Sequence, residues 1–576
     1  MSPLPPLADV AAVRSPDPAE RDAARVAMAA AGLTDPWEPA PGWIAASRPF
    51  PGGAEGEGEA TRRASLLFAQ GADVALTPQR DAAALADLAT SHPDRLAEVE
   101  GDFGFLAFEP TGKATVVRSA SGLIPFYVAG SGERCTVTTT LELMLRLHPV
   151  PGELALDPLI NAIWTSGFAV APARRTFIDG VRALGRGEYA RLDGAEPRFG
   201  VWWAPWDDTR PLLPADEHAE RLRTALIGTL ERELDPRGGN LLALSGGVDS
   251  SAVGALAAGV LGYGVDTLTV LPENAASRSR DLGYIDALDD AVGLGCQLRE
   301  EVSPDRRIEL LDAPAVPFHV LQPYLCLLRS AAAEIPVSTL FGGEFADHTV
   351  GSTLTLRDWS LHTSALDLWR GRRKLPTGPG DVRRWFAWRL QTALRRPPVP
   401  WPGQLPEMIR PELRAEYADW FADRRRAAAA EDRQLPYLAM FLERQGFLGT
   451  HWEISSALGI RRVFPFVTRE LLELAFELHP SELVGPGTKR LLRRALAVDV
   501  PAENLQRPDK GHPGPAAERR PRPWTGPIPA DIEPILAEGW PPGGELPYWD
   551  VFRARQLVAF ARAYARAMSR DIRQRT

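Results

Sequence analysis

The sequence predicts an α+β domain followed by an α/β domain that is built on a parallel sheet. Three observations carry this prediction: a length of 576 residues, a first part made of short β-type runs, and a second part in which strands alternate with helices. A chain of this length has room for two large domains, each with its own core. We place the boundary near residue 205, which gives domains of residues 1–205 and 206–576.

The hydrophobic pattern supports this division. In the first part, short apolar runs are separated by Gly and Pro, as is typical of antiparallel strands. Beyond residue 215, an apolar spacing of helical period leads into runs that alternate with helices, as in a parallel α/β sheet. The expected strands are residues 104–108, 114–117 and 125–128 in the first part, and 240–244, 265–271 and 337–341 in the second.

The composition excludes several classes of protein. Hydrophobic residues make up 45% of the chain and charged residues 24%, which is ordinary globular usage. A net charge of −9 argues against a general nucleic-acid binder. No segment reaches the roughly 20 apolar residues that cross a bilayer, and no signal-peptide pattern is seen. Three widely spaced cysteines indicate neither a disulfide framework nor a zinc site, so we expect a cytoplasmic protein without a membrane span.

Three segments lie outside the expected cores. Residues 371–405 are rich in Arg and Pro, and residues 507–547 are dense in Pro, so both are predicted to be long surface loops. The basic tail, residues 553–576, is predicted to be a helix. Two interpretations of that helix stay open: a solvated helix, or a basic face that docks an acidic peptide.

Residues 241–253 combine an apolar strand, a turn with two glycines and the beginning of a helix. Gly246 and Gly247 permit the backbone to approach an anion closely. The amides of the first helical turn and the helix dipole would then bind that anion. The alternative is a glycine-rich turn without a ligand. Further donors are available from the hydroxyls of Ser245, Ser250 and Ser251.

Asp249 gives this turn its particular chemistry. The turn lacks the lysine of the nucleotide loop that ends in Gly-Lys-Ser/Thr. A carboxylate beside a polyphosphate repels it unless a cation lies between them, so Asp249 is predicted to be a magnesium ligand. The turn therefore predicts a polyphosphate together with Mg²⁺.

A second expected strand also ends in glycines and carboxylates. Residues 338–348 read Ser-Thr-Leu-Phe-Gly-Gly-Glu-Phe-Ala-Asp-His. Ligands of open parallel sheets gather at the carboxyl ends of the strands, so this turn and the first one can share a cleft. Asp249 and Asp347 could then hold magnesium together. The alternative for Glu344 and Asp347 is a pair that caps a surface turn.

The first turn resembles the pyrophosphate loop of the N-type ATP pyrophosphatases, the group that contains asparagine synthetases. This resemblance implies an α/β ATP-pyrophosphatase domain that splits ATP between the α- and β-phosphates and forms an acyl adenylate. The second turn is similar to the family motif Ser-Gly-Glu-Gly-Ser/Ala-Asp-Glu, which implies that Glu344 is the general base and Asp347 a metal ligand. Gly342, Phe345 and His348 depart from that motif. The ATP-binding residues implied by the resemblance are Leu244, Ser245, Gly246, Gly247, Asp249, Ser250, Ser251, Val270, Gly342 and Gly343.

Two downstream segments extend the resemblance. Residues 459–466 resemble the family stretch Gly-x-Glu-x-Arg-x-Pro-Phe, and residues 506–511 resemble its lysine loop. Lys510 is therefore the expected cation that stabilises the tetrahedral oxygen and the leaving phosphate. The alternative is a solvated loop lysine. Glu443 and Glu453 could assist the base, but surface helix carboxylates are an equally simple interpretation.

The first part resembles the glutaminase domain of asparagine synthetases over residues 100–108, 117–127 and 176–189. The resemblance implies an Ntn-type sandwich. A glutaminase of that kind needs an N-terminal cysteine, whose thiolate attacks the glutamine amide. The sequence starts Met1-Ser2-Pro3, so we expect no glutamine hydrolysis and a scaffolding role for this domain.

If glutamine supplies no ammonia, the substrate itself is the simplest source of the amine, which indicates ring closure. The chain resembles lasso peptide cyclases, which join a peptide's N-terminal amine to an Asp or Glu side chain with ATP and Mg²⁺. The expected partner is a leader-cleaved core peptide, and the resemblance adds the leader peptidase and the leader-binding protein of the same pathway. The alternatives are an amide ligase for a small acid, similar to β-lactam or asparagine synthetases, and a non-catalytic peptide-binding scaffold.

Overall fold

The structure is a computed structural model that describes most of the two expected domains. The residues that it describes fall into ranges separated by gaps. These ranges are 7–49, 66–70, 88–99, 102–148, 153–155, 158–160, 174–193, 196–204, 214–271, 275–301, 335–350, 407–416, 451–452, 460–477, 489–507, 521–541 and 543–575.

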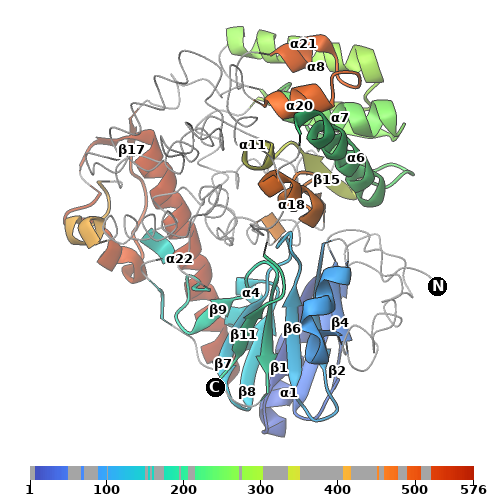
Figure 1. Ribbon diagram of the computed structural model, residues 1–576. Coiled ribbons are helices and arrows are strands. Elements are labelled where there is room, and N and C mark those ends of the chain that lie inside the picture. Colours follow the sequence, from blue (N-terminus) through green and yellow to red (C-terminus); the bar gives the residue numbers. More distant parts are fainter. Residues whose placement is uncertain are drawn as a thin grey trace, which may run out of the picture.

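The first domain is a sandwich of two antiparallel sheets (Figure 1). We call it the sandwich domain. One sheet has the order β2 (Thr34–Trp37), β3 (Trp43–Pro49), β1 (Leu7–Arg14), β8 (Arg134–Thr138), β7 (Tyr127–Ser131) and β9 (Val181–Ala183). The other has the order β11 (Arg198–Val201), β10 (Glu188–Leu192), β6 (Ala114–Arg118), β5 (Phe103–Phe108) and β4 (Leu66–Gln70).

The core of the sandwich comes from the inner faces of both sheets. Val10 of β1 belongs to the same buried cluster as Leu106 of β5 and Val116 of β6. The outer face of the first sheet is covered by α1 (Pro18–Ala30) and α4 (Leu141–Leu147), and the 3₁₀ helix η1 (Pro93–Glu98) precedes β5. Asp17 caps α1 by accepting a hydrogen bond from the amide of Ala19 at 2.9 Å. The expected antiparallel domain is therefore present.

The second domain is built on a five-stranded parallel sheet, and we call it the parallel-sheet domain. Its strand order is β14 (Gln297–Glu301), β13 (Val265–Leu271), β12 (Asn240–Ala243), β15 (Thr339–Gly342) and β16 (Arg461–Val463), and every neighbouring pair is parallel. Its helices are α6 (Ala215–Glu233), α7 (Val248–Gly254), the π-helical segment η2 (Ala255–Val260), α8 (Ala275–Val292), α11 (Ala346–Thr349), α18 (Arg469–Glu477), α20 (Arg490–Ala495) and α21 (Ala502–Gln506).

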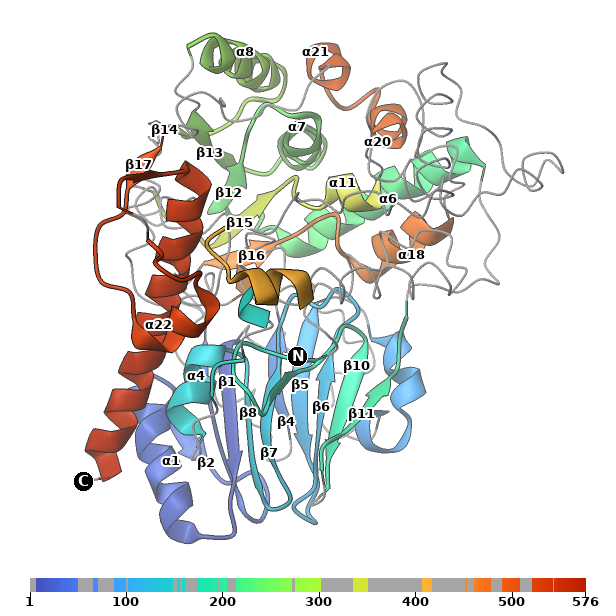
Figure 2. The ribbon, with the colours of Figure 1, turned by 90° about the vertical axis from the view of Figure 1, so that its left-hand side faces the viewer.

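The central strands of this sheet are buried on both faces. Every residue of β15 is buried, and so are the first three residues of β12. Helices α6 and α7 share one buried cluster with Leu242 and Phe341, so both cover the same face of the sheet (Figure 2). The opposite face, which includes Leu241 and Leu340, belongs to a second buried cluster. Covering of both faces explains why these strands are continuous apolar runs rather than alternating ones. The expected parallel sheet is confirmed.

The two domains are in contact along the edge where β16 and α18 lie (Figure 1). The indole Nε1 of Trp203, just after β11, donates to Glu473 Oε1 of α18 at 2.7 Å. The guanidinium of Arg469 donates to the carbonyl of Ala97. One buried hydrophobic cluster also runs through both domains. The sandwich therefore supports the parallel-sheet domain directly.

The C-terminal helix α22 (Tyr548–Arg575) runs along one side of the molecule, past both domains (Figure 2). It contacts α4 of the sandwich. Leu557, Val558 and Ala561 are buried against Ile532 and Ile535 of the 3₁₀ helix η3 (Ala530–Ile535). The short strands β17 (Arg522–Pro523) and β18 (Glu545–Leu546) pair nearby. The prediction of a solvated helix is therefore wrong for this part of α22, because its apolar face is in a core.

The predicted strands agree with the structure to within a few residues at their ends. The run 265–271 is β13, and the run 240–244 is β12 with one residue fewer. The predicted boundary at residues 205 and 206 and the predicted loop 371–405 lie outside the described residues. Within the described part of the chain, no helix has both the length and the apolar character needed to cross a membrane.

Candidate functional site

The two acidic turns lie side by side. β12 pairs with β15, and Ala243 is opposite Gly342, so both strands reach the same level of the sheet before they turn. Gly343 touches the first turn directly. A Cβ on Gly343 would lie 2.5 Å from Asp249 Cβ and 2.5 Å from the amide nitrogen of Ser250. The expectation that the turns share one edge of the sheet is confirmed, and only a glycine permits such a close approach.

Serine hydroxyls hold the first turn in shape. Ser245 Oγ lies 3.2 Å from Ser250 Oγ and accepts from the amide of Gly247 at 3.3 Å. Ser250 Oγ donates to the Gly247 carbonyl at 3.2 Å, and the amide of Ser251 donates to the same carbonyl at 2.9 Å as α7 begins. Two of the serines that were expected to bind phosphate therefore also order the loop. Their hydroxyls are preorganised beside the amides of the turn.

Gly246 is required by its backbone conformation and by its neighbours. Its φ is +67°, in the left-handed region that favours glycine. A Cβ there would lie 2.9 Å from the carbonyl oxygen of Asp281, 3.1 Å from Tyr284 Cβ and 3.2 Å from Arg507 Nη1. The sequence attributed this glycine to the approach of an anion. The structure adds a second reason: α8 and Arg507 pack against the turn and leave no room for a side chain at position 246.

Arg507 braces the first turn from a position with no solvent exposure. Its Nη2 donates to Asp281 Oδ1 at 2.6 Å, its Nη1 donates to the Ser245 carbonyl at 3.4 Å, and its guanidinium lies over the ring of Tyr284 at 4.7 Å. Asn504 of α21 donates to Ser251 Oγ at 3.0 Å. The start of the segment that was predicted to carry Lys510 is thus attached to the phosphate loop.

The second turn contains a strained residue. Phe345 has a φ of +71°, a conformation that costs a non-glycine residue about 1 kcal/mol or more. Its ring is buried and meets the ring of Phe464 edge-on at a centroid distance of 4.9 Å. Phe345 is one of the departures from the family motif, which has a glycine there. Packing of the ring compensates for the backbone strain, and strained residues of this kind cluster at functional sites.

Glu344 is bound by an arginine that the sequence did not reveal. Its Oε1 accepts from Nη2 of Arg462 in β16. A Cβ on Gly342 would collide with Glu344 Oε2, so the carboxylate lies back over the end of β15. The glycine at position 342, another departure from the family motif, is therefore what makes room for the carboxylate.

Lys489 joins the two turns. Its ammonium contacts Asp249 Oδ2 in the first turn and lies 3.2 Å from Asp347 Oδ1 in the second. The side chain is only 7% exposed. Lys489 also has a φ of +59°, immediately before α20 begins. Lys489, like Phe345, therefore has a strained backbone. Its buried ammonium lies between the two aspartates that were predicted to bind magnesium.

The charge balance at this point favours a further cation. Two carboxylates face one ammonium, and Asp249 Oδ1 is buried without a hydrogen-bond partner. Mg²⁺ is bound in proteins by one or two carboxylates together with phosphate oxygens and water. Asp249 and Asp347 fit that role once phosphate supplies the remaining oxygens. Protein groups alone would be too few, since the described residues contain no cluster of three or more His, Cys, Asp or Glu side chains that could hold a metal.

The other predicted residues are only partly described. Leu244 is buried where β12 ends, and its amide donates to the carbonyl of Leu268 in β13 at 3.0 Å. Val270 is near the carboxyl end of β13, one strand away from the first turn. Lys510, Glu443 and Glu453 lie outside the described residues, so their predicted roles stay predictions.

The sequence prediction missed Lys489, Arg462 and Arg507. A signal for Lys489 was available. The chain has only four lysines among 65 basic residues, namely Lys113, Lys374, Lys489 and Lys510. In so arginine-rich a protein, each retained lysine is a candidate for a role that needs a compact ammonium. No comparable signal marks Arg462 or Arg507, since arginines are abundant throughout.

The site combines a strand–loop–helix turn at the carboxyl edge of a parallel sheet with paired aspartates and a buried lysine, an arrangement suited to the phosphates of a nucleotide. The sequence matches the asparagine synthase family over residues 221–569. The match spans more than half of the chain and contains the whole site. The chain therefore belongs to the asparagine synthase family, and its class of activity is ATP-dependent amide-bond formation.

Comparison with solved structures gives weaker likenesses. The allosteric regulatory enzyme of purine biosynthesis is 13% identical, with 47% of this chain and 68% of that chain covered and a TM-score of 0.20. NMN synthetase from Francisella tularensis is 12% identical over 33% of this chain and 99% of that chain, with a TM-score of 0.20. Glutamine phosphoribosylpyrophosphate amidotransferase from B. subtilis is 10% identical. The match covers 58% of this chain and 84% of that chain, with a TM-score of 0.19. TM-scores this low carry no argument. No curated protein matches the sequence.

Proposed function

We propose that this chain is a lasso peptide cyclase. It adenylates an Asp or Glu side-chain carboxylate of a leader-cleaved core peptide and joins it to the peptide's N-terminal amine. AMP and pyrophosphate are the products, and ATP with Mg²⁺ is the energy source. The proposal also names the leader peptidase and the leader-binding protein of the same pathway as partners. It is carried by one observation: Lys489 spans the two acidic turns at the sheet edge.

The chemistry of the site supports activation of a carboxylate. The amides and hydroxyls of the first turn are suited to phosphate oxygens, and Asp249 and Asp347 would hold Mg²⁺ on them. When bound, that ion neutralises phosphate charge as pyrophosphate leaves. The Lys489 ammonium adds a fixed positive charge beside the same phosphates, which stabilises the charge that develops in the transition state. Lys510 is proposed to act on the tetrahedral adduct.

The second half of the reaction assigns a role to Glu344. The amine nitrogen attacks the carbonyl carbon of the acyl adenylate, the bond from that carbon to the phosphate oxygen breaks, and AMP leaves. The nitrogen must lose a proton in this step, and Glu344 is the proposed acceptor. It belongs to the turn that touches the phosphate loop, so the acceptor and the activated carboxylate are on the same edge of the sheet.

The chemistry of the cysteines supports an amine from the substrate rather than from glutamine. Of the two cysteines in the described residues, Cys135 is buried in the sandwich, and burial raises its thiol pKa to about 12. A thiol with such a pKa supplies almost no thiolate near neutral pH, and the thiolate is the nucleophile. Cys296 is exposed at the start of the β14 region, in the other domain.

A direct assay uses synthetic linear peptides with a free N-terminal amine and a single Asp or Glu at varied distances from it. With ATP and Mg²⁺, mass spectrometry should find a peptide that loses one water as AMP and pyrophosphate appear in equal amounts. The same peptide with an acetylated N-terminus is the matched control and should not lose water. Pyrophosphate release with small β-amino acids but with no peptide would instead support the small-acid ligase.

Asp249→Ala tests whether this activity comes from the site described. Removing the carboxylate should lower ATP-dependent water loss by about 10³-fold, because the cation and the phosphates lose a ligand. Lys113→Ala is the control, since Lys113 is exposed between β5 and β6 of the sandwich, and it should retain the wild-type rate. Equal turnover by Asp249→Ala and the wild-type protein would contradict the proposal. A peptide that binds with no turnover in either protein would support the scaffold alternative.

A further inference from the structure

The pair made by Glu344 and Arg462 carries an inference that rests on the proposed function and deepens it. Arg462 has no solvent exposure, although it is an arginine on the edge strand of the sheet. A buried guanidinium is costly unless a partner compensates for its charge. The partner is Glu344, whose carboxylate contacts Arg462 Nη2.

The strand and an aromatic ring fix the position of the guanidinium. β16 pairs with β15 and sets Arg462 opposite Leu340, so its backbone is part of the sheet. Its guanidinium lies 5.0 Å from the centroid of the Phe464 ring. Phe464 in turn meets the ring of Phe345, the residue next to Glu344. Arg462 is therefore attached to the same aromatic cluster as the turn that carries the carboxylate.

The pair is incomplete. A guanidinium and a carboxylate commonly form two parallel hydrogen bonds. Here only Oε1 is bound, and Oε2 is buried without a hydrogen-bond partner in the described part of the protein. On Arg462, Nε and Nη1 are likewise buried and have none. A buried donor or acceptor without a partner lowers the stability of the folded protein. These unpartnered atoms therefore call for an explanation.

We infer that Arg462 is a positioning residue: it fixes one oxygen of Glu344 and so holds this carboxylate in place as the proton acceptor for the attacking amine, with Oε2 left without a partner. An amine N–H is the donor that the site lacks, and it would satisfy Oε2 as the carbon–nitrogen bond forms. The proton leaves the nitrogen for Glu344, and AMP leaves the carbonyl carbon.

The inference separates the two half-reactions. Arg462 does not contact the phosphate loop among the interactions described, whereas Lys489 and Arg507 do. Loss of Arg462 should therefore spare formation of the acyl adenylate and slow only its reaction with an amine that needs a base. Hydroxylamine is a small amine that is already neutral near pH 7. It can attack the adenylate without help from Glu344 and gives a hydroxamate and AMP.

The test compares Arg462→Met with wild-type enzyme on the peptide found in the cyclisation assay, with and without hydroxylamine. Water loss should fall about a hundredfold in kcat, as expected when a base is misplaced by about 1 Å, with little change in KM. Hydroxamate formation should stay at the wild-type rate. Arg462→Lys should recover part of the cyclisation rate, because it restores the charge but not the planar contact with Phe464.

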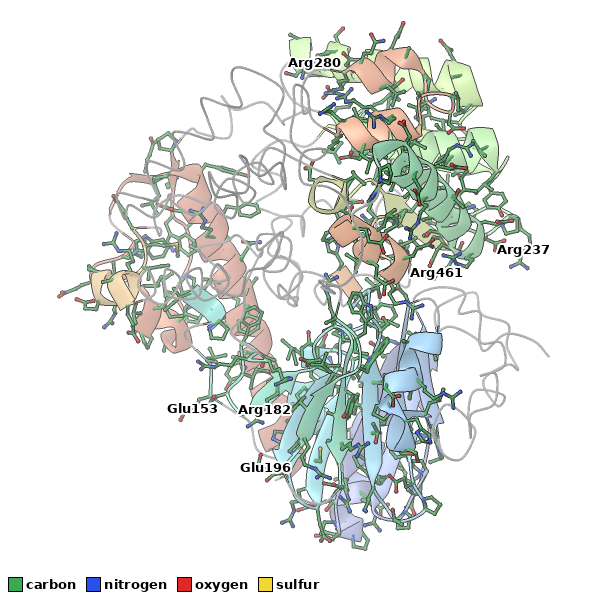
Figure 3. The ribbon with its side chains drawn as sticks, viewed as in Figure 1. Glu153, Arg182, Glu196, Arg237, Arg280 and Arg461 are labelled. Atoms are coloured by element: carbon green, nitrogen blue, oxygen red, sulfur yellow. The ribbon has the colours of Figure 1, made fainter. Side chains whose placement is uncertain are left out.

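Arg461→Met is the matched control. Arg461 precedes Arg462 on the same strand, but its guanidinium donates to the Glu233 carbonyl and to Thr339 Oγ1 instead. Figure 3 shows Arg461 on the side of the parallel-sheet domain that faces the sandwich. Calorimetry with ATP and Mg²⁺ checks that each variant folds. If Arg462→Met fails that check, Arg462→Lys replaces it in the comparison.

Three results would overturn the inference while leaving the proposed function intact. They are wild-type cyclisation by Arg462→Met, equal loss of hydroxamate and lactam in that variant, and an equal loss in Arg461→Met. A wild-type enzyme that forms neither hydroxamate nor lactam from any peptide would overturn the proposed function, and the inference with it. The hydroxamate measurement therefore distinguishes the two failures.

Discussion

Each domain contains a shielded aspartate whose Oδ1 has no hydrogen-bond partner in the described structure, Asp102 in the sandwich and Asp249 in the parallel-sheet domain. Their surroundings differ. Burial, and then the negative charge of Glu233, raise the pKa of Asp102 well above its ordinary value. Asp249 instead contacts the ammonium of Lys489. Arg186 and Arg232 act on Asp102 only in the opposite sense to its burial, by lowering its pKa. The feature that distinguishes Asp249 is direct contact of its other oxygen with a buried ammonium.

Two buried arginines, one in each domain, also differ in their partners. Arg118 in the sandwich donates to the backbone carbonyls of Leu184 and Gly122, so its charge supports the fold. Arg462 in the parallel-sheet domain contacts a carboxylate and keeps two nitrogens unused. Three substitutions test whether this distinction between structural and functional charge is correct.

Lys489→Met should have the largest effect, and it should be on activity. Removing the ammonium leaves Asp249 and Asp347 facing each other and removes a positive charge from the phosphates, so we expect about a 10³-fold loss of ATP-dependent turnover. Pyrophosphate release with the cyclisation substrate measures it. Lys113→Met, on the loop after β5, is the control and should be unaffected. Near-normal turnover in Lys489→Met would remove the distinction between the two aspartates.

Arg118→Met should have the next largest effect, and it should be on stability. The substitution leaves the carbonyls of Leu184 and Gly122 buried without a donor, at a cost of about 1–3 kcal/mol for each. Urea unfolding followed by circular dichroism should show a lower midpoint. The protein that remains folded should keep its turnover number. A loss of turnover without a loss of stability would mean that the sandwich takes part in the reaction.

Asp102→Asn should have the smallest effect, and the effect should depend on pH. Because the folded-state pKa of Asp102 is raised, its stabilising contribution is present below pH 3.8 and is lost as pH rises through the folded pKa. The wild-type protein should therefore lose stability relative to Asp102→Asn as the pH rises above 3.8. Unfolding midpoints at several pH values measure this. A parallel pH profile for the two proteins would show that Asp102 is paired after all.

The sequence could predict the strands because strand formation is indicated by the residue types within a segment of a few residues. Residues 265–271 are rich in β-branched residues and leucine, and the structure has β13 over the same residues. The helix at the C-terminus was also predictable as a helix. Its burial was not, because the partners of Leu557 and Val558 are η3 and residues such as Met408, which are distant in the chain.

The only part of the site that the sequence could predict was the two turns, because each is marked by glycines and carboxylates directly after an expected strand. That rule located the turns after β12 and β15, and the strand order made them neighbours. It could not supply Lys489, which is 240 residues from Asp249 in the chain. The rule also explained only part of the need for glycine at position 246. Asp281 and Arg507 pack so close to Gly246 that a side chain there would collide with them, and this contact exists only in the folded protein.

The sequence by itself determined the two domains, the parallel sheet and the two acidic turns, because periodicity, glycines and strand ends are read within a few residues of each other. Only the tertiary structure decided which basic side chains contact the carboxylates of those turns. Lys489 and Arg462 reach Asp249 and Glu344 from separate segments, and a charge's partner is set by where the packed elements bring it. That is why the chemistry of the turns could be predicted while the groups that control them could not.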